Sequence, residues 1–229
     1  RLLAVATPST GTDHIDLACA RERGIAILSL KDDTDFLGGV TATAELAWTL
    51  LLSTVRHLPW AFEAARNGDW ARDRFLGHQL AGKTLGVLGY GRLGRIVASY
   101  GQAFRMRVLA CDIRDVTPGP GVELVPFDRL LRESDVLTIH IHLNDATAGL
   151  IGAEEFRRMK AGSVLINTSR GAILDEQALL HVLRTGPLDA AGLDVITGEW
   201  MDDQYHHPLL AYAREHTNLV ITPHIGGVA

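Results

Sequence analysis

Cysteine is scarce in this sequence, and its scarcity excludes the small secreted folds that disulfides hold together. The 229 residues include two cysteines, Cys19 and Cys111, and both lie in apolar stretches. A disulfide framework needs several regularly spaced cysteines, so two isolated ones predict free thiols. We therefore expect a reducing compartment, with the cytoplasm as the default location.

The sequence also lacks a large excess of charges of one sign. The formal net charge is −5 and 21% of the residues are charged, without a block of like charges. Nucleic acids and anionic membrane surfaces attract proteins that carry basic patches. The charge pattern therefore predicts no nucleic-acid partner and no membrane partner, and it favours a small molecule.

Long hydrophobic runs are also missing. No continuous apolar run reaches the roughly 20 residues that a membrane-spanning helix needs. The hydrophobic share of 47% is nevertheless ordinary for a globular protein and allows a substantial core. The sequence opens with Arg1 instead of Met or a leader peptide, so we expect it to be a piece of a longer chain.

Short apolar runs alternate with helical patterns along most of the chain. We expect strands at residues 2–6, 25–30, 84–89, 107–111, 135–140, 163–167, 189–195 and 218–222. Parallel strands that are joined by helical crossovers form sheets with helices on both faces. The six strands from residue 84 onward therefore predict a doubly wound α/β domain with a parallel sheet.

The chain is expected to divide into two unequal parts. Residues 1–35 supply only strand, helix and strand, which is too little to bury a core, so we interpret them as the remnant of another domain. Residues 36–229 form the main domain, which includes an apolar helical pattern at 41–67 that is broken around Pro59. We interpret this helical segment as the connection between the domains.

Two helices carry recognisable start and stop signals. Thr12 or Asp13 is expected to cap a helix that ends at Gly24, and Asp175 is expected to cap one that ends near residues 186–187. These signals place both helices between expected strands, as the α/β pattern requires.

The strongest local motif is GYGRLG, which follows the expected strand 84–89 and opens a helix. Gly89 allows a tight turn, Gly91 lets the backbone approach a pyrophosphate, and Gly94 permits close helix packing. Free N–H groups at the helix start favour phosphate. The alternative is a simple tight turn, but the context predicts a dinucleotide site formed by Gly89, Tyr90, Gly91, Arg92, Leu93 and Gly94.

An acidic residue follows this motif at the distance in sequence that is typical of the residue that binds the adenosine ribose. Asp112 lies 18 residues after Gly94, at the end of the expected strand 107–111. A carboxylate there accepts hydrogen bonds from the ribose hydroxyls and repels a 2′-phosphate, which favours NAD over NADP. Asp112 could instead make a local turn, and Arg114 could accommodate a phosphate, so a strict preference stays open.

Three ionisable residues follow three successive expected strands: Arg170, Glu199 and His224. Parallel strands end at one edge of the sheet, so these side chains are expected to gather beside the cofactor. Arginine binds a carboxylate through two hydrogen bonds, histidine exchanges a proton with an alcohol oxygen, and a carboxylate orients the imidazole. Each residue alone could be structural, but together they suggest reduction of a 2-oxo acid.

With these residues the sequence resembles the D-isomer-specific 2-hydroxyacid dehydrogenases, among them D-3-phosphoglycerate dehydrogenase, glyoxylate/hydroxypyruvate reductase and D-lactate dehydrogenase. The resemblance covers essentially the whole chain and rests on the segments GTDHIDLACARERGIAI, TATAELAWTLLL, LAGKTLGVLGYGRLGRIVA, MKAGSVLINTSRGAILDEQAL, GLDVITGEW and ITPHIGG. It implies a Rossmann NAD-binding domain with a partial flavodoxin-like substrate domain at the N-terminus. It also implies a homodimer, which family members form along the helical region that here contains Trp48, Trp60 and Trp70.

The resemblance also implies roles for individual residues. Arg170 would bind the carboxylate and carbonyl of the substrate, His224 would act as the acid/base, and Glu199 would support its imidazole. Further cofactor contacts are implied for Asp194, which would hold the nicotinamide carboxamide, and for His140, Thr168 and Ser169. The implied activity is NAD-dependent interconversion of a small D-2-hydroxy acid and its 2-oxo acid, and the identity of that acid stays open.

The sequence departs from the family pattern at two places. Trp200 and His142 stand where proline is usual, and His142 forms an H-x-H pair with His140. Two histidines are too few ligands for a zinc site, and the pair at 206–207 is interpreted in the same way, so no metal is expected. Trp200 is expected to reshape the mouth of the substrate site.

Two other functions remain open. The C-terminal binding protein corepressors share this fold and these catalytic residues, so an NAD(H)-sensing, dimerising interaction protein with little turnover is the main alternative. A methyltransferase that binds S-adenosylmethionine at the glycine-rich turn would explain Asp112. It would leave Arg170, Glu199 and His224 without roles.

Overall fold

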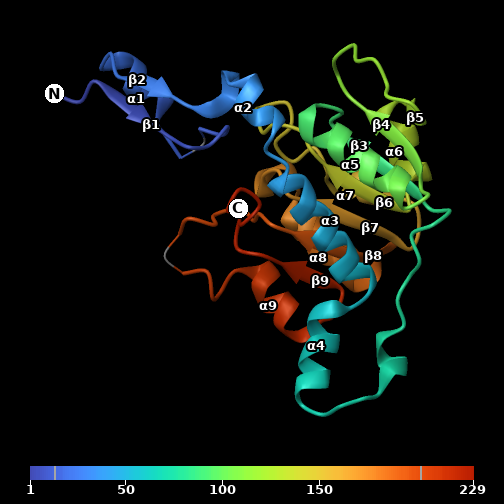
Figure 1. Cartoon of the computed structure of the whole chain (residues 1–229). Helices are drawn as coiled ribbons and strands as arrows, with labels where there is room; N and C mark the ends of the chain where they lie inside the picture. The colour runs from blue at the N-terminus through green and yellow to red at the C-terminus, as the bar shows by residue number, and fades with distance from the viewer. Residues whose placement is uncertain (13, 202) are drawn as a thin grey trace. The chain divides into compact units, whose positions relative to one another are not determined.

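The structure is a computed structural model that describes residues 1–12, 14–201 and 203–229 (Figure 1). It divides into two compact units, Arg1–Thr41 and Ala42–Ala229. The division lies after residue 41, whereas the sequence predicted it after residue 35. Helix α2, Thr34–Gly38, crosses the predicted boundary and belongs to the first unit. That this unit is the remnant of a substrate domain stays a prediction.

The first unit has little core. Strands β1, Ala4–Ala6, and β2, Ala26–Leu28, pair in parallel, and helix α1, Leu17–Glu22, lies between them in the chain. The short 3₁₀ turn η1, Leu30–Asp32, precedes α2. The start signal of α1 was wrongly assigned: the carboxylate of Asp16 caps it by accepting from the N–H of Cys19 at 2.8 Å. Asp13 lies outside the described residues.

The second unit contains a seven-stranded parallel sheet in the order β5-β4-β3-β6-β7-β8-β9. Its strands are β3 Thr84–Leu88, β4 Arg107–Cys111, β5 Val122–Leu124, β6 Val136–Ile139, β7 Ser163–Asn167, β8 Leu188–Leu193 and β9 Leu219–Ile221. The predicted doubly wound parallel sheet is confirmed. The prediction of six strands missed β5, an edge strand whose central Glu123 is exposed and pairs with Arg107.

Helices cover both faces of this sheet (Figure 1). One layer contains α3, Ala42–Val55, and α5, Arg92–Ala103; the other contains α6 Phe127–Glu133, α7 Ala153–Arg158, α8 Glu176–Thr185 and α9 Pro208–Glu215. Each layer buries its own hydrophobic cluster against the sheet. Asp175 caps α8 as predicted, because its carboxylate accepts from the N–H groups of Gln177 and Ala178. Cys19 and Cys111 are free thiols, which is also as predicted.

The helical segment predicted at 41–67 consists of two helices. Helix α3 ends at Val55 and α4, Leu58–Arg66, begins after His57, whose backbone is left-handed at φ 51°. Pro59 lies in the first turn of α4, where a missing N–H costs nothing, so the break precedes the proline.

One stretch, Asp35–Val55, is long and apolar enough by length and composition to cross a membrane, which the search for apolar runs did not anticipate. Its greater part is α3, whose residues Ala44, Ala47, Leu50 and Leu51 are buried. This helix packs on β7, β8 and β9 and on α5, so its apolar character is that of a core helix.

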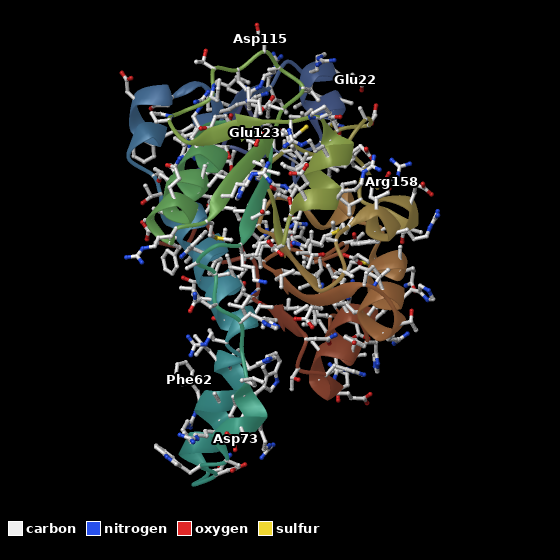
Figure 2. All side chains as sticks on the ribbon, turned by 90° about the vertical axis from the view of Figure 1, so that its right-hand side faces the viewer. Glu22, Phe62, Asp73, Asp115, Glu123 and Arg158 are labelled. Atoms are coloured by element: carbon white, nitrogen blue, oxygen red, sulfur yellow. The ribbon has the colours of Figure 1, made fainter. Side chains whose placement is uncertain are left out.

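Helix α4 and the 3₁₀ turn η2, Arg72–Phe75, form an arm that projects from the sheet and returns to β3 (Figure 1). Phe62 and Asp73 lie far out on this arm (Figure 2). The arm carries no buried residue along α4, and Phe62, Trp70 and Leu76 are exposed by 64%, 83% and 84%. It therefore presents apolar side chains that the described part of the chain leaves uncovered.

Candidate active site and cofactor site

The glycine-rich loop joins β3 to α5 in a form that only glycine can adopt. Gly89 has φ +93°, and a Cβ on it would lie 2.6 Å from the carbonyl oxygen of His140. A Cβ on Gly94 would lie 2.0 Å from the carbonyl oxygen of Gly89. Gly91 caps the N-terminus of the 12-residue helix α5. The loop is thus a close-packed cradle at a helix N-terminus, which suits a pyrophosphate.

The side chain of Tyr90 in this loop is buried, and Arg92 is half-buried. The ring of Tyr90 is buried, its hydroxyl accepts from the N–H of Gly119 at 3.1 Å, and the guanidinium of Arg95 lies 4.4 Å from the ring centre. Tyr90 therefore contributes backbone, not its ring, to the cradle. Burial lowers the pKa of Arg92 from its ordinary value.

Asp112 follows β4 and faces the glycine loop. Its carboxylate accepts from the backbone N–H of Tyr90 at 2.8 Å and from the backbone and side chain of Arg114 at 3.0 Å. The Arg114 guanidinium holds the pKa of this carboxyl down at about 2, and backbone N–H groups of Arg114 and Tyr90 contribute. Asp112 is therefore an anion at the position that the sequence predicted.

The loops after β6 and β7 meet beside the cradle. The hydroxyl of Ser169 donates to the carbonyl of Ile139 at 2.8 Å, and the side chain of Asn167 accepts from the N–H of Ser169 and donates to the carbonyl of Arg170. These bonds bring Ser169, Thr168 and His140 to one edge of the sheet. The predicted cofactor residues of both loops therefore lie together.

Among the buried polar atoms that have no hydrogen-bond partner within the described residues, two belong to the residues that follow β6 and β7: Nδ1 of His140 and the hydroxyl of Thr168. The other ring nitrogen of His140 lies 2.9 Å from the hydroxyl of Thr138. Burial lowers the pKa of His140 to about 4, so its imidazole is neutral at pH 7. Buried orphan groups call for a partner, so these residues and the cradle fit a bound dinucleotide.

Arg170 follows β7 in extended backbone and precedes the 3₁₀ turn η3, Gly171–Ile173. Its guanidinium donates to the carbonyl of Ser169 at 2.7 Å. A Cβ on Gly171 would lie 2.2 Å from the carbonyl carbon of Ile196 and 2.4 Å from the nitrogen of Thr197. The backbone beside Arg170 is thus pressed against the loop that leads to Glu199.

Glu199 and His224 form a direct pair. Nδ1 of His224 lies 2.6 Å from Oε1 of Glu199, although the residues are separated by 25 positions in the sequence. Both side chains are mostly buried, at 30% and 16% exposure for His224 and Glu199. His224 has a left-handed backbone with φ 53°, a conformation that commonly marks a functional site. The bond directs Nε2 of His224 away from Glu199, where it can exchange a proton.

Asp194 holds the loop that carries His224. Its buried carboxylate accepts from the hydroxyl of Thr222 at 2.6 Å and from the N–H groups of Ile225 and Gly226 at 2.9 and 2.8 Å. The N–H of His224 donates to the backbone carbonyl of Asp194 at 2.9 Å. A contact with the nicotinamide carboxamide stays a prediction, while the loop bonds are a role that the sequence did not suggest.

Glu176 is a further residue that the sequence did not single out, and it lies beside His207, which the sequence had suggested only as a weak metal ligand. The carboxylate of Glu176 accepts from the N–H of Thr197 at 2.6 Å, and Nε2 of His207 lies 3.4 Å from that carboxylate and 3.1 Å from the carbonyl of Thr197. His207 also caps α9 by accepting from the N–H of Leu209. Glu176 lies in the first turn of α8, and only that position hints that its side chain could reach a neighbouring loop.

Trp200 and the remaining histidines complete the surroundings. The ring of Trp200 is 75% exposed and lies 5.7 Å from the ring of His224, centre to centre, which agrees with a position at the mouth of the site. His142 is exposed. Within the described ranges, no group of three or more His, Cys, Asp or Glu residues could hold a metal ion.

Comparison with known proteins identifies the family. Residues 48–226 match the family model described as D-isomer specific 2-hydroxyacid dehydrogenase, NAD binding domain. The chain belongs to this family. The match spans most of the second unit, and the family is one of NAD-dependent oxidoreductases, so this unit is an NAD-binding domain.

Individual relatives agree with this assignment. The chain is 41% identical to a glyoxylate reductase from Aeropyrum pernix over 98% of its own length and 67% of the relative. It is 39% identical to a D-3-phosphoglycerate dehydrogenase from Archaeoglobus fulgidus, of which it spans 41%. A crystal structure of D-lactate dehydrogenase from Aquifex aeolicus, complexed with NAD and lactic acid, matches 99% of the chain and 70% of its own, with 32% identity and a TM-score of 0.85.

Proposed function

We propose that the chain is the hydride-transferring part of a dehydrogenase that interconverts a small D-2-hydroxy acid and its 2-oxo acid. The observation that carries the proposal is the 2.6 Å pair of His224 and Glu199, at the sheet edge that also bears the glycine cradle. A histidine oriented by a carboxylate is suited to proton exchange with an alcohol or carbonyl oxygen. The family assignment supports the same chemistry.

Each residue of the site has a separate task in this proposal. The glycine cradle would hold a nicotinamide dinucleotide, which would supply the hydride for the carbonyl carbon. His224 donates a proton from Nε2 to the carbonyl oxygen, and Glu199 stabilises the imidazolium that precedes this step. Arg170 binds the carboxylate of the acid through its planar guanidinium and orients the carbonyl. In the oxidation direction, neutral His224 takes the proton from the hydroxyl.

The substrate class is proposed as small 2-oxo acids. Glyoxylate reductase, D-3-phosphoglycerate dehydrogenase and D-lactate dehydrogenase are the names of relatives, and they share a carboxylate beside the reacting carbon. We also propose that the protein is located in the cytoplasm, because its two cysteines are free thiols and thiols stay reduced in that compartment.

The test is the loss of NADH absorbance with a panel of glyoxylate, hydroxypyruvate, 3-phosphohydroxypyruvate and pyruvate. At least one acid should be reduced, and His224→Asn should lower the turnover of that acid by about 10²- to 10⁴-fold if the imidazole is the acid/base. Binding of NADH, followed by tryptophan fluorescence, should be kept in the variant. Tight NADH binding without reduction of any acid would overturn the proposal and favour a sensing protein.

A further inference from the structure

Both members of the pair formed by His224 and Glu199 are followed directly by a large apolar side chain that is exposed. Trp200 comes after Glu199, and Ile225 comes after His224. Large apolar side chains that are exposed beside reactive groups commonly belong to a ligand-binding surface. The loops after β8 and β9 therefore place apolar surface next to the atoms that would exchange the proton.

The ring of Trp200 is close enough to His224 to touch a substrate. The two ring centres are 5.7 Å apart and the ring planes differ by 39°. Nδ1 of His224 faces Glu199, so Nε2 is the nitrogen that meets the substrate. A carbonyl oxygen that takes the proton lies about 3 Å from Nε2. The side chain of the acid begins two bonds beyond that oxygen, within reach of the indole.

The loop holds Trp200 in a closed turn. The carbonyl of Gly198 accepts from the N–H of Met201 at 3.0 Å and from Nε2 of Gln204 at 2.8 Å. The same side-chain nitrogen of Gln204 donates to the carbonyl of Met201 at 3.0 Å. Gly198 has φ +73°, a backbone conformation that favours glycine. Because the backbone on both sides of Trp200 is fixed, a contact with its ring costs little conformational entropy.

The charges of this loop disfavour a substrate with a second anionic group. Residues 197–207 include three acidic residues and neither lysine nor arginine. The histidines at 206 and 207 lie 3.8 and 3.4 Å from acidic side chains. Arg214 of α9 lies over the ring of Tyr205 and donates to its carbonyl at 3.0 Å, so it is engaged at the other end of the loop. The surroundings of Trp200 therefore suit an uncharged side chain better than a phosphate or a carboxylate.

We propose that Trp200 selects 2-oxo acids with a branched or aromatic apolar side chain over acids whose side chain carries a phosphate or a second carboxylate. The inference rests on the proposed function and deepens it by naming the substrate class. Arg170 holds the carboxylate of the acid and His224 meets its carbonyl oxygen. The side chain of the acid lies against the indole of Trp200, where its apolar surface leaves water.

The experiment measures binding of 2-oxo acids to the chain in excess NAD⁺, because the oxidised cofactor has no hydride to transfer. Calorimetry gives dissociation constants for 4-methyl-2-oxopentanoate, phenylpyruvate, 2-oxoglutarate and 3-phosphohydroxypyruvate. The first and third acids have side chains of similar size, so the ratio of their constants reports side-chain polarity. In the unaltered chain, 4-methyl-2-oxopentanoate should bind about 10- to 100-fold more tightly than 2-oxoglutarate.

Trp200→Ala should reduce this preference about tenfold, because the apolar side chain loses its aromatic contact. Trp200→Phe keeps an aromatic ring and should keep most of the preference. The matched control is Trp70→Ala, which removes another exposed tryptophan, one that lies in the arm after α4. It should leave the ratio unchanged. Binding of NAD⁺, measured in the same titrations, checks that each variant is folded.

Two results would overturn the inference. One is 2-oxoglutarate binding as tightly as 4-methyl-2-oxopentanoate in the unaltered chain. The other is an unchanged ratio in Trp200→Ala, which would mean that the indole contacts something other than the side chain of the acid.

Failure of this inference is distinguishable from failure of the proposed function when reduction rates with NADH are measured on the same acids. Binding in the expected ratio without reduction of any acid would contradict the dehydrogenase proposal and support the role of Trp200. Reduction of an acid, combined with a ratio that Trp200→Ala leaves unchanged, would do the reverse. Absence of binding by every acid in the presence of NAD⁺ would overturn both.

Discussion

At the scale of single residues, the role that we propose for Arg170 is the hardest for another side chain to fill. A guanidinium donates through a planar fork, while an ammonium is a point charge. Arg170→Lys should therefore lose most turnover, by about 10- to 100-fold, because a charge-assisted bidentate contact is worth roughly 1.5–3 kcal/mol. Steady-state rates and NADH binding should be measured together. Equal rates in both proteins would remove Arg170 from the substrate site.

His140, which lies at the sheet edge of the proposed cofactor site, should make the free energy of unfolding depend on pH. Its folded-state pKa is lowered to about 4 by burial, below the ordinary value of 6.5. The unfolded chain therefore binds a proton more readily between these values, so stability is lost as the pH falls from about 6.5 to 4. The full loss from this residue is about 3 kcal/mol in the free energy of unfolding.

Urea unfolding of the unaltered chain and of His140→Gln at pH 7 and pH 4.5 checks this prediction. Glutamine carries no proton at either pH, so the unaltered chain should lose about 2 kcal/mol more than the variant on acidification. The same loss in both proteins would mean that the imidazole of His140 is not buried as described.

The positions of site residues could be predicted from the sequence where an ionisable residue follows directly after an expected strand. Arg170, Glu199 and His224 were singled out because each comes just after an expected strand, and the pair of His224 and Glu199 lies as close as that reasoning expected. The loop bonds of Asp194 and the contact of Glu176 with Thr197 were not predictable. They join segments whose mutual approach depends on packing and not on spacing in the chain.

At the scale of elements, Glu176 connects the start of α8 to the loop after β8. Glu176→Ala removes the acceptor of the Thr197 N–H, two residues before Glu199. The loosened loop should lower kcat about tenfold, because Glu199 no longer orients His224 reliably. This corresponds to an activation barrier that is higher by roughly 1.4 kcal/mol. The KM for the acid and the dissociation constant of NADH should change little.

Glu176→Gln is the matched variant, because its amide oxygen can still accept from Thr197. It should keep most of the turnover that the alanine variant loses. The positioning role fails if Glu176→Ala turns over at the unaltered rate, or if the glutamine variant is as slow as the alanine variant.

The elements themselves were largely predictable, since buried parallel strands are continuous apolar runs. The failures were β5, whose exposed Glu123 interrupts the apolar pattern, and the break between α3 and α4. That break depends on the left-handed backbone of His57, a residue type that gives no strong turn signal.

At the scale of the whole molecule, we propose that the arm formed by α4 and η2 makes the chain a homodimer. Large apolar side chains that are exposed close together in the chain mark interaction surfaces, and Phe62, Trp70 and Leu76 are such residues. Phe62 lies far out on the arm (Figure 2). Phe62→Glu places a charge in that surface and should shift the chain from dimer toward monomer.

Sedimentation at micromolar concentration measures this shift. Ile113→Glu is the control, because Ile113 is a fully exposed apolar residue that follows β4 and not the arm. It should leave the dimer intact. A monomeric unaltered chain, or an unaffected dimer in Phe62→Glu, would contradict the proposed interface.

The proposed reaction is hydride transfer to the carbon beside a carboxylate. It is tested most directly with NADH that carries deuterium at the transferable position of the nicotinamide, followed by mass spectrometry and chiral separation of the acid that is reduced. We expect deuterium at C2 of the D-2-hydroxy acid. A product without deuterium at C2, or the L-enantiomer, would contradict it.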